Sequence, residues 1–215
     1  MLKERKRLKV RDAAAQWEVI QKEFNVEEFI NYFAVNMCVQ NWDGFFNNYF
    51  VYRDVKPGSK WEIYPWDQDK TWGEYDGASE RFDWYDMPLT MGMQGDNPPR
   101  LRGLMRFEGG GPFGGASWWR PPGWFSGPLL ANPEFRQRFK KRLAEICLTV
   151  FTPAKMEPLV VSLENRLGPE IMIRAGLTRQ DPAEASRRFQ RHLDSFRNQA
   201  EHRRQFILNA LSKEK

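Results

Sequence analysis

Five polar residues in the first third of the chain have the types and spacing that metal-assisted phosphoryl transfer requires: Asp43, Asn47, Asn48, Asp67 and Asp69. Such a reaction uses one aspartate to orient an attacking hydroxyl and accept its proton. It also uses an asparagine and a second aspartate to hold the magnesium ions that bridge the nucleotide phosphates. These five residues can act together only if the fold brings positions 43–48 and 67–69 to one place.

A β-hairpin between the two groups would bring them together. Residues 48–53 (NYFVYR) and 60–64 (KWEIY) are rich in aromatic and β-branched types, which predicts two strands. The segment between them contains Pro57 and Gly58, which favour a tight turn, and Pro65 ends the second strand. Because a hairpin brings its outer ends together, we expect the polar groups to meet at one edge.

The spacing of these residues matches a known arrangement. In protein kinases the catalytic-loop asparagine follows the aspartate by five residues, as Asn48 follows Asp43. A hairpin then leads to the metal-binding aspartate, which corresponds to Asp67. The alternative is that Asp43, Asn47 and Asn48 are turn and capping residues, since both residue types favour turns through their own hydrogen bonds.

Residues 67–71 also fit two other motifs. The run Asp67-Gln68-Asp69-Lys70-Thr71 matches D-x-D-x-T, the nucleophile motif of haloacid-dehalogenase phosphatases. That fold needs a parallel sheet made of later strands, and the sequence continues instead with a glycine-rich stretch and helices. A calcium-binding loop needs glycine at its sixth position, where Trp72 stands. The phosphatase is kept as the less favoured alternative.

Composition and charge narrow the class of protein. Aromatic residues make up 14% of the 215 residues, which predicts a packed globular body. No stretch approaches the roughly 18–20 apolar residues of a transmembrane helix, and the charged start MLKERKRLKV is no signal peptide. The formal charge is −6 over residues 13–133, whereas both ends are basic. Divalent cations bind acidic clusters, so the middle is the candidate for chemistry.

Helices are predicted on both sides of this region. Capping boxes are expected at Asn25 with Glu28 and at Asp181 with Glu184. Residues 77–131 hold much of the glycine, which favours a long irregular loop, either pinned by its tryptophans or binding substrate. The predicted helices cover residues 13–24, 25–41, 132–150, 152–167 and 181–211, and the fourth should face inward with Met156, Leu159, Val160, Leu163 and Leu167.

The last predicted helix is strongly basic. A solvated face is the more common role of such a helix, so nucleic acid is an unlikely partner. Its arginines are Arg187, Arg188, Arg191, Arg197, Arg203 and Arg204.

Four stretches of the chain resemble the CotH family of atypical protein kinases, which are similar to spore coat protein H. Residues 29–54, FINYFAVNMCVQNWDGFFNNYFVYRD, and 60–73, KWEIYPWDQDKTWG, carry its D…N-Y pattern and its P-W-D-x-D motif. The segments GPLLANPEFRQRFKKRLAEI and HRRQFILNAL support the likeness, which extends over about residues 25–212.

The resemblance implies a fold, an activity and residue roles. The fold would be α+β, with a helical body like a kinase C-lobe and a hairpin that carries the site. The activity would be transfer of phosphate from ATP to Ser or Thr hydroxyls with Mg²⁺ or Mn²⁺. Asp43 would be the catalytic aspartate and Asn48 the catalytic-loop asparagine, which also contacts metal and nucleotide. Asp67 would bind metal and nucleotide, and Asp69 would support the metal.

The likeness also implies partners and an architecture. The expected substrate is a secreted or spore-coat-type protein, which places the chain at a coat, at a cell surface or outside the cell. Family members carry an N-terminal lobe that holds the ATP phosphates, whereas residues 1–24 form only a basic helical segment here. We therefore expect residues 25–212 to be the C-terminal portion of such a domain, with little activity alone. The alternative is a non-catalytic coat or cell-surface interaction module.

Overall fold

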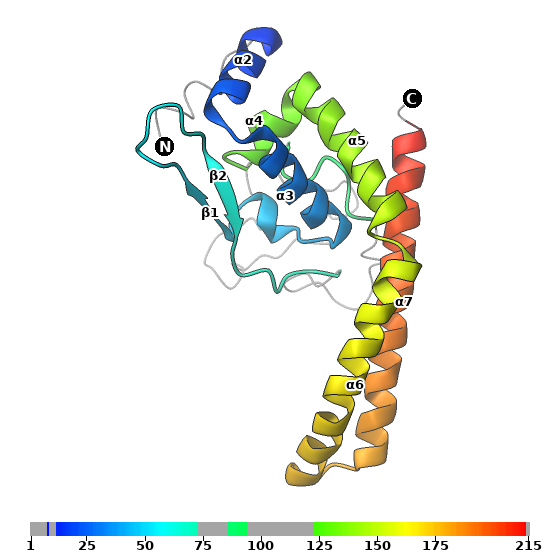
Figure 1. Ribbon diagram of the computed structural model, residues 1–215. Coiled ribbons are helices and arrows are strands. Elements are labelled where there is room, and N and C mark those ends of the chain that lie inside the picture. The colour runs from blue at the N-terminus through cyan, green and yellow to red at the C-terminus, as the bar shows by residue number, and fades with distance from the viewer. Residues whose placement is uncertain (1–7, 9–11, 73–85, 94–122, 214–215) are drawn as a thin grey trace, which may run out of the picture. The chain divides into compact units, whose positions relative to one another are not determined.

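The computed structural model describes residue 8 and residues 12–72, 86–93 and 123–213, and it forms two compact units, residues 1–143 and 144–215. Helices dominate, and one two-stranded antiparallel sheet accompanies them, so the predicted α+β class is confirmed (Figure 1). The elements are α2 (Ala13–Glu23), α3 (Val26–Cys38), η1 (Asp43–Phe45), β1 (Tyr49–Tyr52), β2 (Glu62–Pro65), α4 (Ser126–Ala131), α5 (Pro133–Thr149), α6 (Pro153–Leu177) and α7 (Pro182–Ser212).

The core of the first unit is built around α3 and an aromatic cluster. Four phenylalanines, Phe24, Phe29, Phe33 and Phe45, are fully buried, and most ring pairs among them and Phe125 meet edge to face or tilted. Phe33 and Phe45 instead stack, with centroids 5.7 Å apart and planes 12° apart. Because Phe45 belongs to η1, this stacking fixes the short helix that begins with Asp43.

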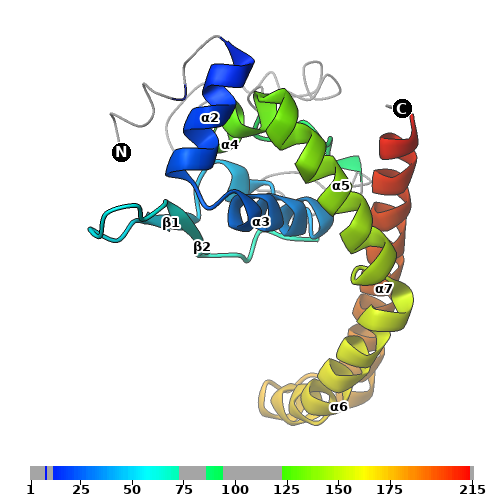
Figure 2. The ribbon, with the colours of Figure 1, turned by 45° about the horizontal axis from the view of Figure 1, so that its top comes forward.

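The predicted hairpin is confirmed. Strands β1 and β2 pair antiparallel, with Tyr49 opposite Pro65 and Tyr52 opposite Glu62. The turn between them places Gly58 at φ +82°, a conformation that favours glycine. The hairpin lies beside α3 (Figure 2). From that position the hairpin contacts the start of α3, where the Ile63 N–H donates to Glu28.

The capping box predicted at Asn25 and Glu28 is wrong in its details. Asn25 is the N-cap residue, but its side chain makes no hydrogen bond to the helix backbone. Its amide instead donates to Glu28 Oε2 at 2.9 Å, and Glu28 Oε1 accepts from the backbone N–H of Ile63 at 3.3 Å. The hairpin thus takes the carboxylate that would have capped the helix. Burial raises the pKa of Glu28 above its ordinary value.

The irregular loop predicted for residues 77–131 is wrong at its C-terminal end. Residues 73–85 and 94–122 lie outside the described part of the chain, but residues 126–131 form the short helix α4. The buried Ser126 hydroxyl donates to the carbonyls of Phe45 and Gly92, at 2.7 and 3.1 Å. A Cβ at Gly123 would lie 2.2 Å from the Phe45 carbonyl oxygen, so glycine is needed for this close approach.

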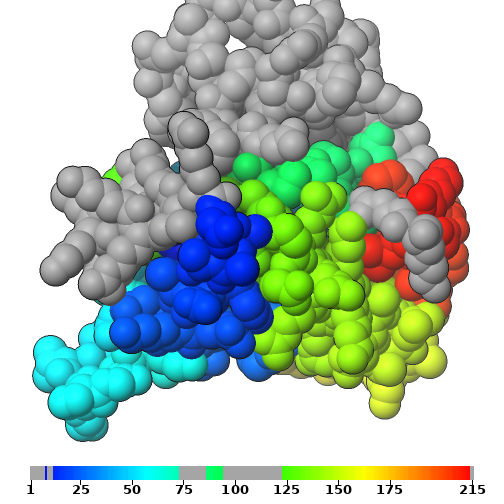
Figure 3. Space-filling view, turned by 90° about the horizontal axis from the view of Figure 1, so that it is seen from above, coloured from blue at the N-terminus to red at the C-terminus, as the bar shows by residue number. Residues whose placement is uncertain are grey.

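Helix α5 begins as the sequence predicts. Asn132 Oδ1 accepts from the backbone N–H groups of Glu134 and Phe135 at 3.1 and 3.2 Å. The Asn132 amide donates to the Ala13 carbonyl and to Gln16 Oε1, which joins the start of α5 to the start of α2. Helix α2 and the first part of α5 lie side by side (Figure 3).

The second unit is dominated by the antiparallel pair of α6 and α7 (Figure 1). Asp181 caps α7 by accepting from the Ala183 N–H at 2.9 Å, as predicted. Glu184 does not complete a capping box, because its carboxylate binds Arg187 and Arg191. Those exposed ion pairs take the oxygens that a capping box would use.

The inward-facing stripe predicted for α6 is largely wrong. Val160 is buried, but Leu159, Leu163 and Leu167 are 60%, 45% and 43% exposed. Each residue turns a helix by about 100°, so neighbouring positions point in different directions. The buried side of α6 runs through Val160 and Ala175, and the leucines lie on another side.

The solvated basic face predicted on α7 is wrong at Arg203, which is fully buried with its guanidinium 5.2 Å from the Phe206 ring. Arg204 is only partly exposed and donates to the Cys147 carbonyl at 2.8 Å. Arg187 and Arg191 agree with the prediction, since both are exposed and bind Glu184.

Within the described ranges, no single helix has both the length and the apolar character needed to cross a membrane. Helices α5 and α6 meet these two criteria only when they are taken together, as a bent pair.

Candidate functional site

Asp43 is held at the start of η1. Its backbone carbonyl accepts from the N–H groups of Phe46 and Asn47, and the residue is only 8% exposed. Its Oδ2 accepts from Asn48 Nδ2 at 2.7 Å, and its Oδ1 lies 3.4 Å from Asn47 Nδ2. The structure therefore brings together the predicted catalytic aspartate and the predicted catalytic-loop asparagine.

Asn48 and Asp67 lie at the same end of the hairpin. The Asn48 carbonyl accepts from the Trp66 N–H at 3.0 Å, which extends the strand register by one residue pair. Asp67 comes next in the chain and is exposed, as is Asp69. Asn48 and Asp67 both have left-handed backbone conformations, φ 55° and 51°, which asparagine and aspartate tolerate better than most residues.

Gln68 joins the two arms of this site. Its Nε2 donates to the carbonyls of Asn48 and Trp66, at 2.8 and 2.6 Å. Its Oε1 accepts from Asn41 Nδ2 at 2.6 Å. Sequence reasoning missed this role, because the partners of Gln68 lie 20 and 27 residues away in the chain and Asp67, beside it, has a left-handed backbone rather than the extended one of a strand.

A buried polar network holds the backbone of η1 at Gly44. The Gly44 N–H donates to Asn41 Oδ1 at 3.1 Å, and its carbonyl accepts from the Tyr32 hydroxyl at 3.0 Å. Burial raises the pKa of the Tyr32 phenol, which therefore remains a proton donor. A Cβ at Gly44 would lie 2.7 Å from Asn36 Oδ1, so a larger residue would displace the network.

The oxygen atoms at the hairpin end suit magnesium. In the part of the chain that the structure describes, no three His, Cys, Asp or Glu side chains form a metal-binding group. Magnesium needs fewer protein ligands, because it is commonly held by one or two carboxylates together with substrate phosphates. Asn48 donates its amide nitrogen to Asp43, so its Oδ1 is the atom suited to a cation. The exposed carboxylates of Asp67 and Asp69 add oxygen atoms of the type that magnesium prefers.

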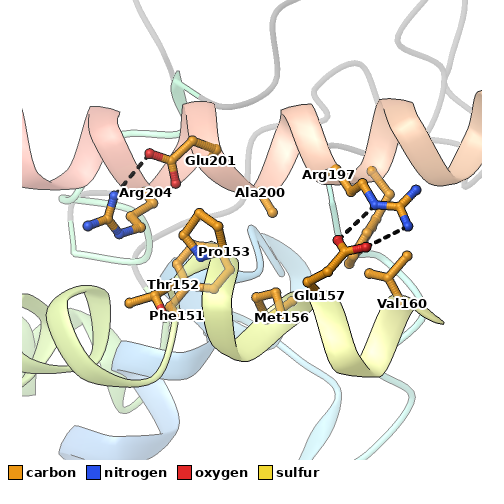
Figure 4. Close-up of a pocket in the computed structure, with 11 residues that line it drawn as sticks. Phe151, Thr152, Pro153, Met156, Glu157, Val160, Arg197, Ala200, Glu201 and Arg204 are labelled. Carbon is orange, nitrogen blue, oxygen red and sulfur yellow. Dashed lines mark hydrogen bonds and ion pairs between the residues drawn. The ribbon is translucent and has the colours of Figure 1, made fainter. Parts of the chain in front are cut away.

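A hollow lies in the second unit, between α6 and α7 (Figure 4). It has a volume of about 210 Å³, and none of the predicted site residues lines it. Arg197 binds Glu157 through two hydrogen bonds of 2.9 Å, and Arg204 binds Glu201 at 3.0 Å. Apolar side chains form most of its remaining wall, among them Phe151, Pro153, Met156, Val160, Phe196 and Ala200.

Replacing Gln68 with alanine should disturb the site beyond its effect on stability. The variant loses hydrogen bonds to Asn48, Trp66 and Asn41. We expect it to lower the free energy of unfolding by about 1–3 kcal/mol in urea. We also expect weaker Mn²⁺ binding by calorimetry, because the backbone of Asn48 and the residues beside Asp67 lose a restraint.

Gln16→Ala is the matched control. Gln16 is likewise half-buried, donates to the Leu8 carbonyl and accepts from Asn132. It should cost similar stability and leave Mn²⁺ affinity unchanged. Equal loss of affinity in both variants would show that Gln68 acts only through global stability.

Residues 7–207 match the family of CotH kinase proteins. The chain belongs to the CotH kinase family. That match extends over α2 through most of α7, and it includes every predicted site residue.

Two named proteins are similar to this CotH-family chain. The inner spore coat protein H of Bacillus subtilis is 25% identical over 196 residues, which cover 90% of this chain and 43% of the relative. The invasin CotH2 of Rhizopus delemar is 22% identical over 165 residues, which cover 75% of this chain and 24% of the relative. The chain therefore spans less than half the length of either relative. No solved structure gives a significant match.

Proposed function

We propose that the hairpin end of this CotH-family chain takes part in ATP- and Mg²⁺-dependent phosphoryl transfer to serine or threonine hydroxyls of another protein. The observation that carries the proposal is the 2.7 Å hydrogen bond from Asn48 to Asp43, made at the hairpin end that also bears Asp67. Phosphoryl transfer relies on positioning and electrostatics, and in this proposal these residues would supply both.

Each residue has a distinct proposed part. Asp43 would orient the acceptor hydroxyl and take its proton, because each carboxylate oxygen has lone pairs beyond those used by Asn47 and Asn48. Asn48 Oδ1 and Asp67 would hold magnesium, and Asp69 would support it from the next exposed position. Magnesium–ATP, when bound, supplies the phosphoryl group and the positive charge that stabilises the phosphate oxygens.

The relatives suggest the class of acceptor. One is named as a spore coat protein and the other as an invasin. We therefore propose an acceptor that is a coat or cell-surface protein, and a location of this chain at such a surface.

The direct test is transfer of label from γ-labelled ATP. The chain is incubated with Mg²⁺ or Mn²⁺ and a Ser/Thr-rich acceptor protein, and phosphoserine and phosphothreonine are then measured. Label on the acceptor is expected to depend on the divalent cation and to be weak, since little activity is expected of this chain alone. A chain that binds no divalent cation and no metal–ATP would overturn the proposal, whereas weak transfer would not.

A non-catalytic interaction module is the second candidate. The exposed aromatic face of the hairpin favours it, because Phe50 and Trp66 are 57% and 60% exposed and lie 5.4 Å apart. A module of this kind would bind its partner without ATP. A phosphatase would instead release phosphate from a model ester and carry it on Asp67.

A further inference from the structure

The exposed side of α6 has the spacing of a coiled-coil seam. Six positions are separated by alternating steps of four and three residues: 159, 163, 166, 170, 173 and 177. A strict 4-3 alternation is the a/d pattern by which one helix packs along another. The four outer positions are apolar and exposed: Leu159 60%, Leu163 45%, Ile173 57% and Leu177 81%.

This seam is separate from the side of α6 that packs in the second unit. Val160 and Ala175 are 2% exposed. Each lies about 100° or more around the helix from the centre of the seam, at 100° per residue. The seam is therefore an additional apolar surface on a helix that already has its α7 contact. We name it the α6 seam.

The centre of the α6 seam is charged. Arg166 and Glu170 are both exposed and occupy its two middle positions, between the leucine pair and the Ile173–Leu177 pair. Charges in the middle of an apolar seam are costly to bury unless an opposite charge meets them. Their signs therefore restrict what can cover the seam.

A second copy of the same helix, running antiparallel, meets this requirement. If the two-fold axis passes beside position 168, each position faces the partner's position equally far on the other side of 168. Leu159 then faces the partner's Leu177 and Leu163 faces the partner's Ile173. At the centre, Arg166 faces the partner's Glu170, and the two-fold axis repeats each contact. A parallel pair would instead set Arg166 against Arg166 and Glu170 against Glu170.

We propose that the α6 seam is the interface of an antiparallel homodimer. The surface is self-complementary in both apolar pattern and charge, which is the condition for a closed two-fold contact. The 19 positions from 159 to 177 span about 27 Å of helix. The central Arg166–Glu170 pairs set the register and direction of the two helices, a role that polar seam residues have in coiled coils.

The first test measures the oligomeric state of the full chain by sedimentation equilibrium. We expect a monomer–dimer equilibrium. Leu163→Lys should raise the dimer dissociation constant by about a hundredfold, because the lost apolar contact occurs twice by symmetry. Met172→Lys is the matched control, since Met172 is 51% exposed on the same helix but lies off the seam. Helical circular dichroism should be unchanged in both variants.

The second test exchanges the central charges. Arg166→Glu alone or Glu170→Arg alone sets like charges together at both central contacts, and each should raise the dissociation constant by at least about tenfold. The double exchange should restore the dimer. An equal mixture of the two single variants should form a heterodimer, because one chain then presents only acidic central positions and the other only basic ones.

Arg188→Glu, an equal change of charge on α7, is the control and should leave the dimer intact. A chain that stays monomeric over the whole concentration range would overturn the proposal. Binding of the α6 seam to lipid vesicles or to another protein would not rescue it. A dimer unaffected by Leu163→Lys would also overturn it. Single exchanges that the double exchange does not rescue would exclude the antiparallel register.

Discussion

Asp43→Asn should lower phosphoryl transfer by about 10²–10⁴-fold, the range for loss of a positioned general base. An asparagine at this position can keep the oxygen that accepts from Asn48 but cannot take a proton from the acceptor hydroxyl. Binding of metal–nucleotide should remain, because the proposed ligands are Asn48 and Asp67. The measurement is label transfer from γ-labelled ATP, together with calorimetric titration of Mn²⁺–ATP.

The control for this change is Asp54→Asn. Asp54 lies beyond β1, toward the turn of the hairpin, and pairs with Lys56 at 2.9 Å. It should keep full transfer, since it lies at the opposite end of the hairpin from the candidate site. If Asp43→Asn retained full transfer with the fold intact, Asp43 would be a structural residue of η1.

Asp67→Asn should weaken Mn²⁺–nucleotide binding by about a hundredfold or more. The change removes one negative charge from beside a dication, and a charge pair 4 Å apart near a protein surface is worth about 4 kcal/mol. Asparagine tolerates the left-handed backbone at this position, φ 51°, so the fold should be kept. Calorimetry with Mn²⁺–ATP measures the affinity, and circular dichroism measures the fold.

Asp69→Asn gives a graded comparison for the same experiment. Asp69 is also exposed, and its proposed part is to support the metal, so its loss should cost less affinity than loss of Asp67. Asp54→Asn again serves as the control and should bind normally. Unchanged affinity in Asp67→Asn would contradict the metal role, and loss of helical signal would indicate a structural aspartate.

The sequence alone determined the elements whose signals are local. Phe29, Phe33 and Met37 recur at helical spacing, which predicts the helix over residues 25–41, and all three are buried on α3. Pro57 and Gly58 predicted the turn, and the strand residues on each side predicted the pairing. Asp43 and Asn48 came together because only five residues separate them.

The tertiary structure decided features that depend on distant partners. Glu28 was expected to cap its own helix, but the Ile63 N–H of the hairpin, 35 residues away, takes its carboxylate. Residues 126–131 form a helix after the glycine-rich stretch, and the hydroxyl of Ser126 at its start binds the Phe45 carbonyl, 81 residues away. Neither partner is visible in the local sequence.

Dependence on distant partners also explains which side of α6 is buried and which groups Gln68 binds. Leu159 and Val160 are neighbours of similar hydrophobicity, so periodicity could not decide which would be buried. Only packing within the second unit selects Val160 and leaves Leu159 on the α6 seam. Gln68 joins Asn41 and Asn48, 27 and 20 residues away, and pairwise contacts at such distances form only once the chain has folded.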